Sequence, residues 1–461
     1  MRLVDVRKPR IMLGVDHKWR DLMSYSHLKL LLEERYGFEV FLIHRGWEPF
    51  YLSLVRPDIL ILEGLFYDKW TVLARELHSM GVKVVILPTE GAPASLPGKL
   101  RLAGKQYDYS NVDLFCSWNE SIKDLILELG KLPSERIRIT GGPRFDFYRP
   151  PLHRLVRDRS ETLLKHGLRP DRPTVTFATN FCWAGVAPEV LAHEWKVSKA
   201  NETGVEWFED PYVLAVGEEK SRDAMVDAMV KIRKDFGDVN IILRPHPSED
   251  QQFYHRFLRR TGLKGVAFIY EDFIWNVLNA TDVLIARTST VSFDAWFCGK
   301  PTIEFQIEPD RASKTFWKEF GPGSDMVETY DQLREHLTRY LGGGEVPAAM
   351  REARQVVLDR YFYKTDGRSS ERFGEALREL AEGIPYRPSK DFEIARRFLP
   401  HGPKVVLGEL KGFFHGPLIS HLVGKRVDYL GRFDRFIYPE DIRTSLRKMR
   451  GHRKVWSGNG Q

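Results

Sequence analysis

The 461-residue sequence predicts an α/β protein built from two successive domains, each a doubly wound parallel sheet covered by helices. Short apolar runs rich in β-branched residues alternate with helical stretches through the first 145 residues, and this alternation restarts after residue 170. Residues 146–170 lie between the two series and carry prolines and many charges, which is typical of a linker. We therefore expect domains over residues 1–145 and 171–384, followed by an extension over residues 385–461.

The expected strands of the first domain are residues 10–15, 38–43, 58–62, 82–87, 113–118 and 136–140. The helices expected between them are residues 26–37, 69–81 and 120–130. The expected strands of the second domain are residues 174–179, 240–244, 265–270, 282–287 and 301–305. Its expected helices are residues 218–236, 249–260, 272–279, 290–298 and 330–341. The weakly periodic stretch 181–210 is expected to be an insertion or an active-site loop.

Composition limits the class of protein. Hydrophobic residues make up 43% of the chain and charged residues 29%, as in ordinary folded domains. No apolar run approaches the ~20 residues that a membrane-spanning helix needs, and the apolar run near the start is too short for a signal peptide. The three cysteines, Cys116, Cys182 and Cys298, are odd in number and far apart, which favours reduced thiols in a cytosolic protein.

Positive charge gathers at the C-terminus. Residues 385–461 hold 16 Lys and Arg against 7 Asp and Glu, whereas the whole chain has a net charge of only +7. Such a tail could bind anionic lipid, nucleic acid or an acidic glycan, or its charges could simply form a solvent-exposed face. Apolar runs such as 403–410 could instead pack as a structural arm on the body of the protein. The aromatic residues interleaved with the charges are Phe398, Phe413, Phe414, Phe433, Phe436 and Trp456, and they favour attachment to a membrane surface.

A histidine between two prolines follows one strand of the second domain, in the sequence Arg244-Pro-His246-Pro. Ser248 and Gln251 form a capping-box pattern, so a helix is expected to start there. The prolines fix the backbone beside His246, while the helix start and Arg244 add positive charge. An isolated motif of this kind is more often a tight connection in which the histidine packs or caps.

A second feature favours anion binding in the same domain. The strand over residues 282–287 is followed by Thr288, Ser289 and Thr290 at an expected helix start, and Asn180 follows the first strand of the domain. Hydroxyls at such a place commonly cap the helix, and they can also donate to phosphate oxygens. The sequence has no Walker lysine motif and no Gly-x-Gly-x-x-Gly after a strand, so phosphate binding would depend on His246, hydroxyls and helix starts.

The first domain offers carboxylates at the ends of three expected strands: Asp16, Glu63 and Glu90. Glu90 stands in Pro-Thr-Glu-Gly, where Gly91 is expected to allow a sharp turn and to leave room for a ligand. A carboxylate in a cleft can act as a general base, a nucleophile or a stabiliser of positive charge. Each one alone is more often a turn-former or a cap.

Together these motifs resemble a group of GT-B glycosyltransferases. The stretches that carry the resemblance are "ITGGPRFDFY" (139–148), "FATNF" (177–181), "LRPHP" (243–247) and "ARTSTVSFDAWFCGKPTIEF" (286–305). The sequence is similar to bacterial surface carbohydrate biosynthesis proteins, capsular Kdo transferases, sialyltransferases and polysialyltransferases. Its His-Pro domain also resembles the CDP-glycerol glycerophosphotransferases of teichoic-acid synthesis. The resemblance covers residues 10–380 and implies a GT-B fold, with two Rossmann-like domains facing across a cleft.

The resemblance also implies roles for residues. His246 would contact the nucleotide phosphate, Ser289 and Thr290 would complete that site, and Glu90 would match the catalytic carboxylate. Thr-Glu-Gly stands here in place of a doubled acid before glycine, so Glu63 and Asp16 stay rivals for catalysis. Arg244, Thr288 and Asn180 are expected beside the donor nucleotide.

The implied function is transfer of a sugar from a nucleotide donor, with a CMP-ulosonic acid such as CMP-Kdo or CMP-sialic acid favoured. The acceptor would be a surface polysaccharide or a glycolipid, and lipid-linked acceptors would place the enzyme at the inner face of the membrane. One alternative is a CDP-glycerol-type glycerophosphotransferase, and others are a GT-B nucleotide-sugar epimerase and a binding protein without catalysis. The sequence contains no Asp-x-Asp, which argues against a transferase that clamps its donor with a metal, so no metal or cofactor is expected. We also expect a cytoplasmic enzyme without a nucleic-acid partner.

Overall fold

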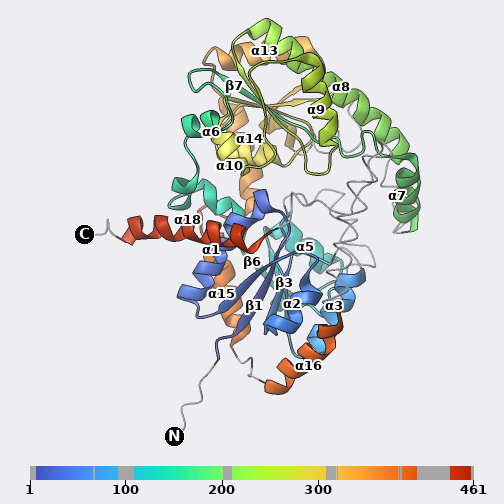
Figure 1. The fold of residues 1–461 in the computed structure, drawn as a ribbon, viewed down its shortest axis with the longest axis vertical. Helices are drawn as coiled ribbons and strands as arrows, with labels where there is room; N and C mark the ends of the chain where they lie inside the picture. The colour runs from blue at the N-terminus through green and yellow to red at the C-terminus, as the bar shows by residue number, and fades with distance from the viewer. Residues whose placement is uncertain are drawn as a thin grey trace. The chain divides into compact units, whose positions relative to one another are not determined.

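A computed structural model describes residues 7–65, 68–91, 108–200, 210–307, 318, 320–382, 384, 387–401 and 437–457. The chain forms two compact units. The first unit combines Met1–Leu155 with Arg360–Gln461, and the second is Val156–Asp359. Each unit contains a six-stranded parallel sheet surrounded by helices (Figure 1), which confirms the predicted α/β fold class.

The first sheet has the strand order β2-β1-β3-β4-β5-β6. Its strands are β1 (Arg10–Val15), β2 (Glu39–His44), β3 (Ile59–Leu62), β4 (Lys83–Ile86), β5 (Leu114–Ser117) and β6 (Ile137–Ile139). Helices of the same part of the chain are α1 (Lys18–Arg35), α2 (Glu48–Val55), α3 (Asp68–Ser79) and α5 (Glu120–Glu128). All of the expected strands are present, whereas α2 was not expected.

Helix α1 begins at Lys18, well before the expected residue 26, because His17 caps it. The Nδ1 atom of His17 accepts the N–H of Trp19 at 3.2 Å, and the carboxylate of Asp21 accepts the N–H of His17 at 3.1 Å. Reciprocal bonds of this kind satisfy two of the donors that a helix start leaves without partners. A histidine cap is outside the usual set of capping residues, so the sequence pattern did not show it.

The first sheet is apolar on both faces. Successive side chains of a strand point to opposite faces, so Leu60 packs with Met12 and Val84 on one face. Ile59 and Leu13 pack on the other face. Sheets covered on both sides need nearly continuous apolar strands, and this explains why the strands could be predicted from the sequence.

The second sheet has the strand order β12-β11-β10-β7-β8-β9. Its strands are β7 (Thr174–Ala178), β8 (Asn240–Arg244), β9 (Val266–Phe268), β10 (Val283–Ala286), β11 (Thr302–Phe305) and β12 (Asp325–Val327). Its helices are α6 (Arg159–Lys165), α7 (Pro188–Ala200), α8 (Pro211–Phe236), α9 (Gln251–Thr261), α10 (Ile274–Ala280), α11 (Val291–Phe297) and α13 (Tyr330–Leu341), and α14 (Ala348–Phe362) leads out of the unit. Strand β12 was not expected, and α7 occupies part of the stretch that was expected to be a loop.

The chain returns to the first sheet earlier than the expected boundary at residue 384. Helix α15 (Ser369–Ala381) buries Phe373 and Leu377 against the first sheet. Its first turn is held by Asp146, whose carboxylate accepts the N–H of Ser369 at 2.9 Å and that of Ser370 at 2.8 Å. Asp146 is buried, although it opens the expected linker. Helical periodicity shows that α15 has an apolar face, but it does not show which sheet covers that face.

Two further helices of the C-terminal extension also pack on the first unit. Helix α16 (Pro388–Phe398) buries Ile394 and Phe398 in the core beside α2. Its Lys390 forms a buried ion pair with Asp58. Phe398 is therefore unavailable for the expected membrane contact, because it belongs to the core.

Helix α18 (Pro439–Ser457) packs on α1 through Ser445 and Met449, both buried. The run 403–410, the phenylalanines at 413, 414, 433 and 436, and the side chain of Trp456 lie outside the described residues. No helix in the described part of the chain is both long and apolar enough to span a bilayer.

Candidate functional site

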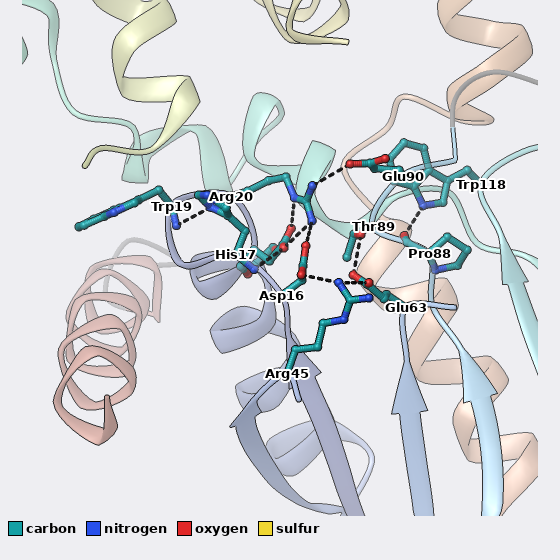
Figure 2. A network of polar contacts seen from close by, with 12 residues as sticks. Asp16, His17, Trp19, Arg20, Arg45, Glu63, Pro88, Thr89, Glu90 and Trp118 are labelled. Carbon is teal, nitrogen blue, oxygen red and sulfur yellow. Dashed lines mark hydrogen bonds and ion pairs between the residues drawn. The ribbon is translucent and has the colours of Figure 1, made fainter. Parts of the chain in front are cut away.

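Polar side chains gather where the strands of the first sheet end. Asp16 follows β1, Arg45 follows β2, Glu63 follows β3 and Glu90 lies in the loop after β4. The carboxyl ends of parallel strands meet at one edge, which is where ligands bind in open α/β sheets. Figure 2 shows that these side chains point toward one another.

Arg20, in the first turn of α1, connects two of the three expected carboxylates. Its Nη2 atom lies 2.7 Å from Oδ2 of Asp16, and its Nη1 atom lies 3.1 Å from Oε1 of Glu90. Its Nε atom also lies 2.9 Å from Oδ1 of the buried Asp21. One guanidinium therefore fixes the start of α1 to the loop after β4.

Arg45 connects the third carboxylate to the same group. Its Nη1 atom lies 2.6 Å from Oδ1 of Asp16, and it also forms an ion pair with Glu63. The hydroxyl of Thr89 donates to Oε2 of Glu63 at 3.1 Å. The structure thus brings Asp16, Glu63 and Glu90 into one network.

The three carboxylates differ in access to solvent. The side chain of Glu90 is 67% exposed, that of Asp16 is 21% exposed and that of Glu63 is 8% exposed. Burial raises the pKa of Glu63 to about 8, and the charge of Asp16 adds to this effect while Arg45 opposes it. Burial therefore disfavours the charged form of Glu63, and Glu90 is the most exposed of the three carboxylates.

The loop that carries Glu90 is packed tightly. A Cβ atom at Gly91 would lie 2.7 Å from the ring of Trp118, so this glycine makes room for the indole and not for a ligand, contrary to the expectation. The indole N–H of Trp118 donates to the carbonyl of Pro88 at 2.8 Å, and Asn119 donates to the carbonyl of Gly91 at 3.0 Å. These contacts hold the backbone on either side of Glu90.

In the second unit, His246 lies in a turn after β8. Its Nδ1 atom accepts the N–H of Ser248 at 3.1 Å and lies 3.2 Å from Sγ of Cys182. Because Nδ1 accepts from a backbone N–H, the proton of the neutral ring is on Nε2, which is then a donor. This is the form of the ring that suits a phosphate oxygen.

The expected helix start at Ser248 is wrong, since α9 begins at Gln251 and its cap is Asp250. The reason is that Glu249 turns into the core. There it accepts the N–H of His246 at 2.7 Å and the hydroxyl of Thr179 at 2.7 Å. The segment after His246 therefore forms a turn before the helix begins.

The expected hydroxyls follow β10. Thr288 has a φ of 45°, and its carbonyl accepts from the amide of Asn180 at 3.1 Å. The hydroxyl of Ser289 accepts the N–H of Val291 at 3.4 Å, and Thr290 is exposed. The structure brings Asn180 and Thr288 together, whereas Arg244 donates to the carbonyl of Ile269 at 3.3 Å, on the side of β9.

Sequence reasoning missed four buried charged residues beneath these loops: Glu218, Glu249, Arg287 and Glu304. Arg287 donates to the carbonyl of Asn180 at 2.7 Å and lies 3.3 Å from Oε1 of Glu218. A glutamate inside the apolar strand "TIEF" was a signal for Glu304. Glu218 lies in a long helix, where nothing in the sequence distinguishes it from surface residues. Across the described ranges, no group of three or more His, Cys, Asp or Glu side chains could hold a metal ion.

The two parallel sheets with polar strand ends are those of an α/β protein, and the comparison with known families indicates an enzyme of the glycosyltransferase type. Residues 77–379 match the family described as CDP-Glycerol:Poly(glycerophosphate) glycerophosphotransferase. This match spans more than half of the sequence, so the chain belongs to that family. A search among curated proteins finds no match.

Solved structures show the same fold at low sequence identity. A variant of the wall teichoic acid polymerase TagF, soaked with CDPG, aligns with a TM-score of 0.54 at 14% identity, over 83% of this chain and 91% of that one. The UDP-GlcNAc 2-epimerase from Neisseria meningitidis, bound to UDP-GlcNAc, aligns with a TM-score of 0.51 at 10% identity, over 81% of this chain and 100% of that one. These similarities establish the two-domain GT-B-like fold. The expected resemblance to Kdo and sialyl transferases stays a prediction.

Proposed function

We propose that the protein transfers glycerol phosphate, or a closely related alcohol phosphate, from a CDP-activated donor to a hydroxyl group of a polymer or lipid-linked acceptor. The observation that carries this proposal is the family match over residues 77–379. It favours the CDP-glycerol alternative over the CMP-ulosonic acid donor that the sequence motifs suggested.

The reaction would proceed by attack on the β-phosphorus of the donor. The acceptor oxygen forms a bond to this phosphorus, and the bond from the β-phosphorus to the bridging oxygen breaks. CMP leaves with the electron pair of that bond, and the acceptor proton passes to a general base. Catalysis of such a transfer depends on positioning and on stabilisation of the charge on the phosphates.

The first unit would supply the base. Glu90 fits this role because its carboxylate is exposed while Arg20 holds its position. Asp16, placed between Arg20 and Arg45, would fix the two arginines. Glu63 would then be a buried acid behind Glu90.

The second unit would bind the donor. The Nε2–H of His246 and the hydroxyls of Ser289 and Thr290 are donors of the kind that diphosphate oxygens accept, and Thr288, whose hydroxyl donates to Gln306, would set the conformation of the loop that carries them. Arg244 and Asn180 would contribute from the ends of neighbouring strands. Arg287, which is buried, would add positive charge beneath the loop.

The function is tested in two steps. A thermal-shift screen with CMP, CDP, UDP, GDP and TDP identifies the nucleotide, and we expect the cytidine nucleotides to stabilise the protein most. CDP-glycerol and CMP-Kdo are then supplied with an acceptor, and phosphorus in the acceptor product is measured. Phosphorus in the product supports the proposal. A glycosylated product without phosphorus would restore the CMP-ulosonic acid donor, and epimerised donor without CMP release would indicate an epimerase.

We also propose that α18 attaches the enzyme to an anionic membrane surface at the cytoplasmic face. Arg443, Arg447, Lys448 and Arg450 are exposed on this helix. Arg443 and Arg447 also pair with Glu440 at the start of the helix. An ion pair of 2.7 Å between Lys18 and Asp441 holds α18 beside the strand end that carries Asp16. An acceptor in the membrane would thus lie near the carboxylates.

A further inference from the structure

Three loops at the carboxyl edge of the second sheet each donate a backbone N–H to a buried glutamate. The N–H of Trp183 donates to Glu218 at 2.6 Å, that of His246 to Glu249 at 2.7 Å, and that of Thr288 to Glu304 at 2.7 Å. The exposed fractions of these glutamates are 6%, 4% and 1%. A buried carboxyl group is costly, so a repeated arrangement of this kind calls for a physical explanation.

Glu304 holds its loop from two sides. It lies in β11, where its Cα pairs in register with that of Ala286, the last residue of β10. Its Oε2 atom accepts the N–H of Thr288, and its Oε1 atom accepts the hydroxyl of Ser292 at 2.7 Å. The segment from Thr288 to the first turn of α11 is therefore tied to one side chain in the sheet.

The loop needs this restraint because Thr288 is strained. Its φ of 45° is in the left-handed region, which costs a β-branched residue roughly 1–3 kcal/mol. Two further bonds act on the same residue, because its hydroxyl donates to Gln306 at 3.3 Å and its carbonyl accepts from Asn180. Without the acceptor on Glu304, Thr288 would relax to an ordinary conformation, and the two hydroxyls that follow it would turn away.

The charge of Glu304 also matters beneath a phosphate site. The positive charge of Arg287, which directly follows β10, lowers the pKa of Glu304. The hydrogen-bond partners of Glu304 are the hydroxyl of Ser292 in α11 and the N–H of Thr288. Burial raises the pKa of Glu304 to about 7. A protonated Glu304 keeps both hydrogen bonds, since Oε2 accepts from Thr288 while the acid proton is donated to Ser292, and it adds no negative charge below the donor.

We propose that Glu304 is a positioning residue of the donor site: it holds Thr288 in the left-handed conformation that presents Ser289 and Thr290 to the diphosphate of the donor. This inference rests on the proposed function. The competing explanation is that Glu304 only fastens the start of α11 and contributes nothing to donor binding.

The first test measures the affinity for CDP-glycerol by calorimetry in the full-length protein. Glu304→Ala should raise Kd about tenfold to a hundredfold, because the loop loses its restraint. Glu304→Gln should keep a Kd close to that of the wild type near pH 7, because an amide can accept from Thr288 and donate to Ser292.

The control is Ile303→Ala, which opens a cavity at a neighbouring core residue with no exposed surface. Ile303→Ala should lower the melting temperature without changing the Kd for CDP-glycerol. If Ile303→Ala and Glu304→Ala lose affinity equally, Glu304 has only a structural role.

A second test uses the strain itself. Glycine adopts a positive φ without steric cost, so Thr288→Gly should restore most of the donor affinity that Glu304→Ala removes. A purely structural role for Glu304 predicts no such rescue, because glycine at residue 288 does not refill the space left in β11. A double variant that binds no better than Glu304→Ala would overturn the proposal.

A third test follows pH. In the wild type, donor affinity should fall between pH 6 and pH 8, as Glu304 loses its proton beneath the phosphates. All other titratable groups are the same in the wild type and in Glu304→Gln. The difference between the wild type and Glu304→Gln therefore isolates Glu304, and identical profiles for the two proteins would count against the proposal.

Failure of the proposed function can be told apart from failure of this inference. Hydrogen exchange in the segment 286–292 is measured without any ligand, and Glu304→Ala should speed it well beyond the effect of Ile303→Ala. If the wild type does not bind CDP-glycerol, the donor assignment is wrong, while the exchange result still decides whether Glu304 holds the loop. Equal exchange in the two alanine variants would overturn the inference whatever the donor proves to be.

Discussion

Arg20 lies 3.1 Å from Glu90, between its Nη1 atom and the Oε1 atom of the carboxylate. This ion pair joins the first turn of α1 to the loop after β4, and the two residues are 70 positions apart in the sequence. It holds an exposed carboxylate in place without burying it, which suits a group that must receive a proton from a substrate. The same arginine reaches Asp16, so changes at any of the three residues will affect the others.

The first prediction concerns the base. Glu90→Gln keeps the shape of the side chain and its contact with Arg20, but it removes the charge that accepts a proton. Turnover should fall by at least about a hundredfold, while the Kd for the cytidine nucleotide stays unchanged. Single-turnover assays and calorimetry measure the two quantities. If Glu63→Gln or Asp16→Asn abolishes turnover and Glu90→Gln does not, a neighbouring strand end supplies the base.

The second prediction concerns the donor phosphate. His246→Ala removes the Nε2 donor and should weaken nucleotide binding by about 1.5–3 kcal/mol, the range for hydrogen bonds to charged groups. Calorimetry with CDP measures this change. The melting temperature should change little, because the ring is half-buried and the N–H of Ser248 can bind water in its place. Unaltered affinity for CDP would remove His246 from the donor site.

The third prediction concerns stability and pH. Glu48 is fully buried at the start of α2, and its Oε2 atom accepts the N–H of Gly46 at 2.8 Å. Burial raises the pKa of Glu48 from 4.5 to about 7. A carboxyl group with a raised pKa contributes stability at low pH and loses it as the pH rises, here between about pH 4.5 and pH 7. The loss should reach about 3 kcal/mol, since each pKa unit corresponds to about 1.4 kcal/mol.

Melting temperatures of the wild type and Glu48→Gln, measured from pH 5 to pH 8, test this prediction. Glu48→Gln should lose less stability than the wild type over this range. Its melting temperature should therefore rise relative to that of the wild type as the pH rises. A constant difference across the range would show that Glu48 is ionised throughout.

The fourth prediction concerns α18. Replacing Arg443, Arg447 and Lys448 with glutamate should abolish co-sedimentation with anionic vesicles at low salt, because each basic residue near such a surface contributes about 1 kcal/mol. Nucleotide binding should be retained. These changes are preferable to removal of the whole extension, which would also remove Phe398 from the core.

The matched control for α18 is the same charge reversal on another exposed basic helix. Arg256, Arg259 and Arg260 of α9 serve this purpose, since all three are exposed. If the two sets of changes reduce vesicle binding equally, the attraction is a property of the net charge and α18 has no special role.

Much of the candidate site was predictable because it lies at the ends of apolar strands. The runs that form β1, β3 and β4 located Asp16, Glu63 and Glu90, and the arrangement of the sheet brought them together. The arginines that organise these carboxylates were not predictable in the same way. Arg20 and Arg45 resemble surface cations in the sequence, and only the fold shows that they face the strand ends.

The errors have a common physical cause. Ser248 fits the pattern of a helix cap, but burial of Glu249 makes the chain turn once more before α9 begins. The boundary expected at residue 384 ignored a contact between Asp146 and Ser369, residues that are 223 positions apart. Local patterns carry no information on such pairings, because a tertiary contact outweighs the preferences of a few neighbouring residues.

The return of α15 to the first sheet has a consequence for synthesis of the protein. The strands of this sheet are synthesised before the second unit, but Phe373 and Leu377, which help α1 to cover one face, belong to the last fifth of the chain. Until α15 is made, this face is covered only in part, by α1, while the second unit is translated and folds. Contacts this distant form slowly and leave apolar surface open to aggregation, so we expect the first unit to be the more aggregation-prone part of the chain during synthesis.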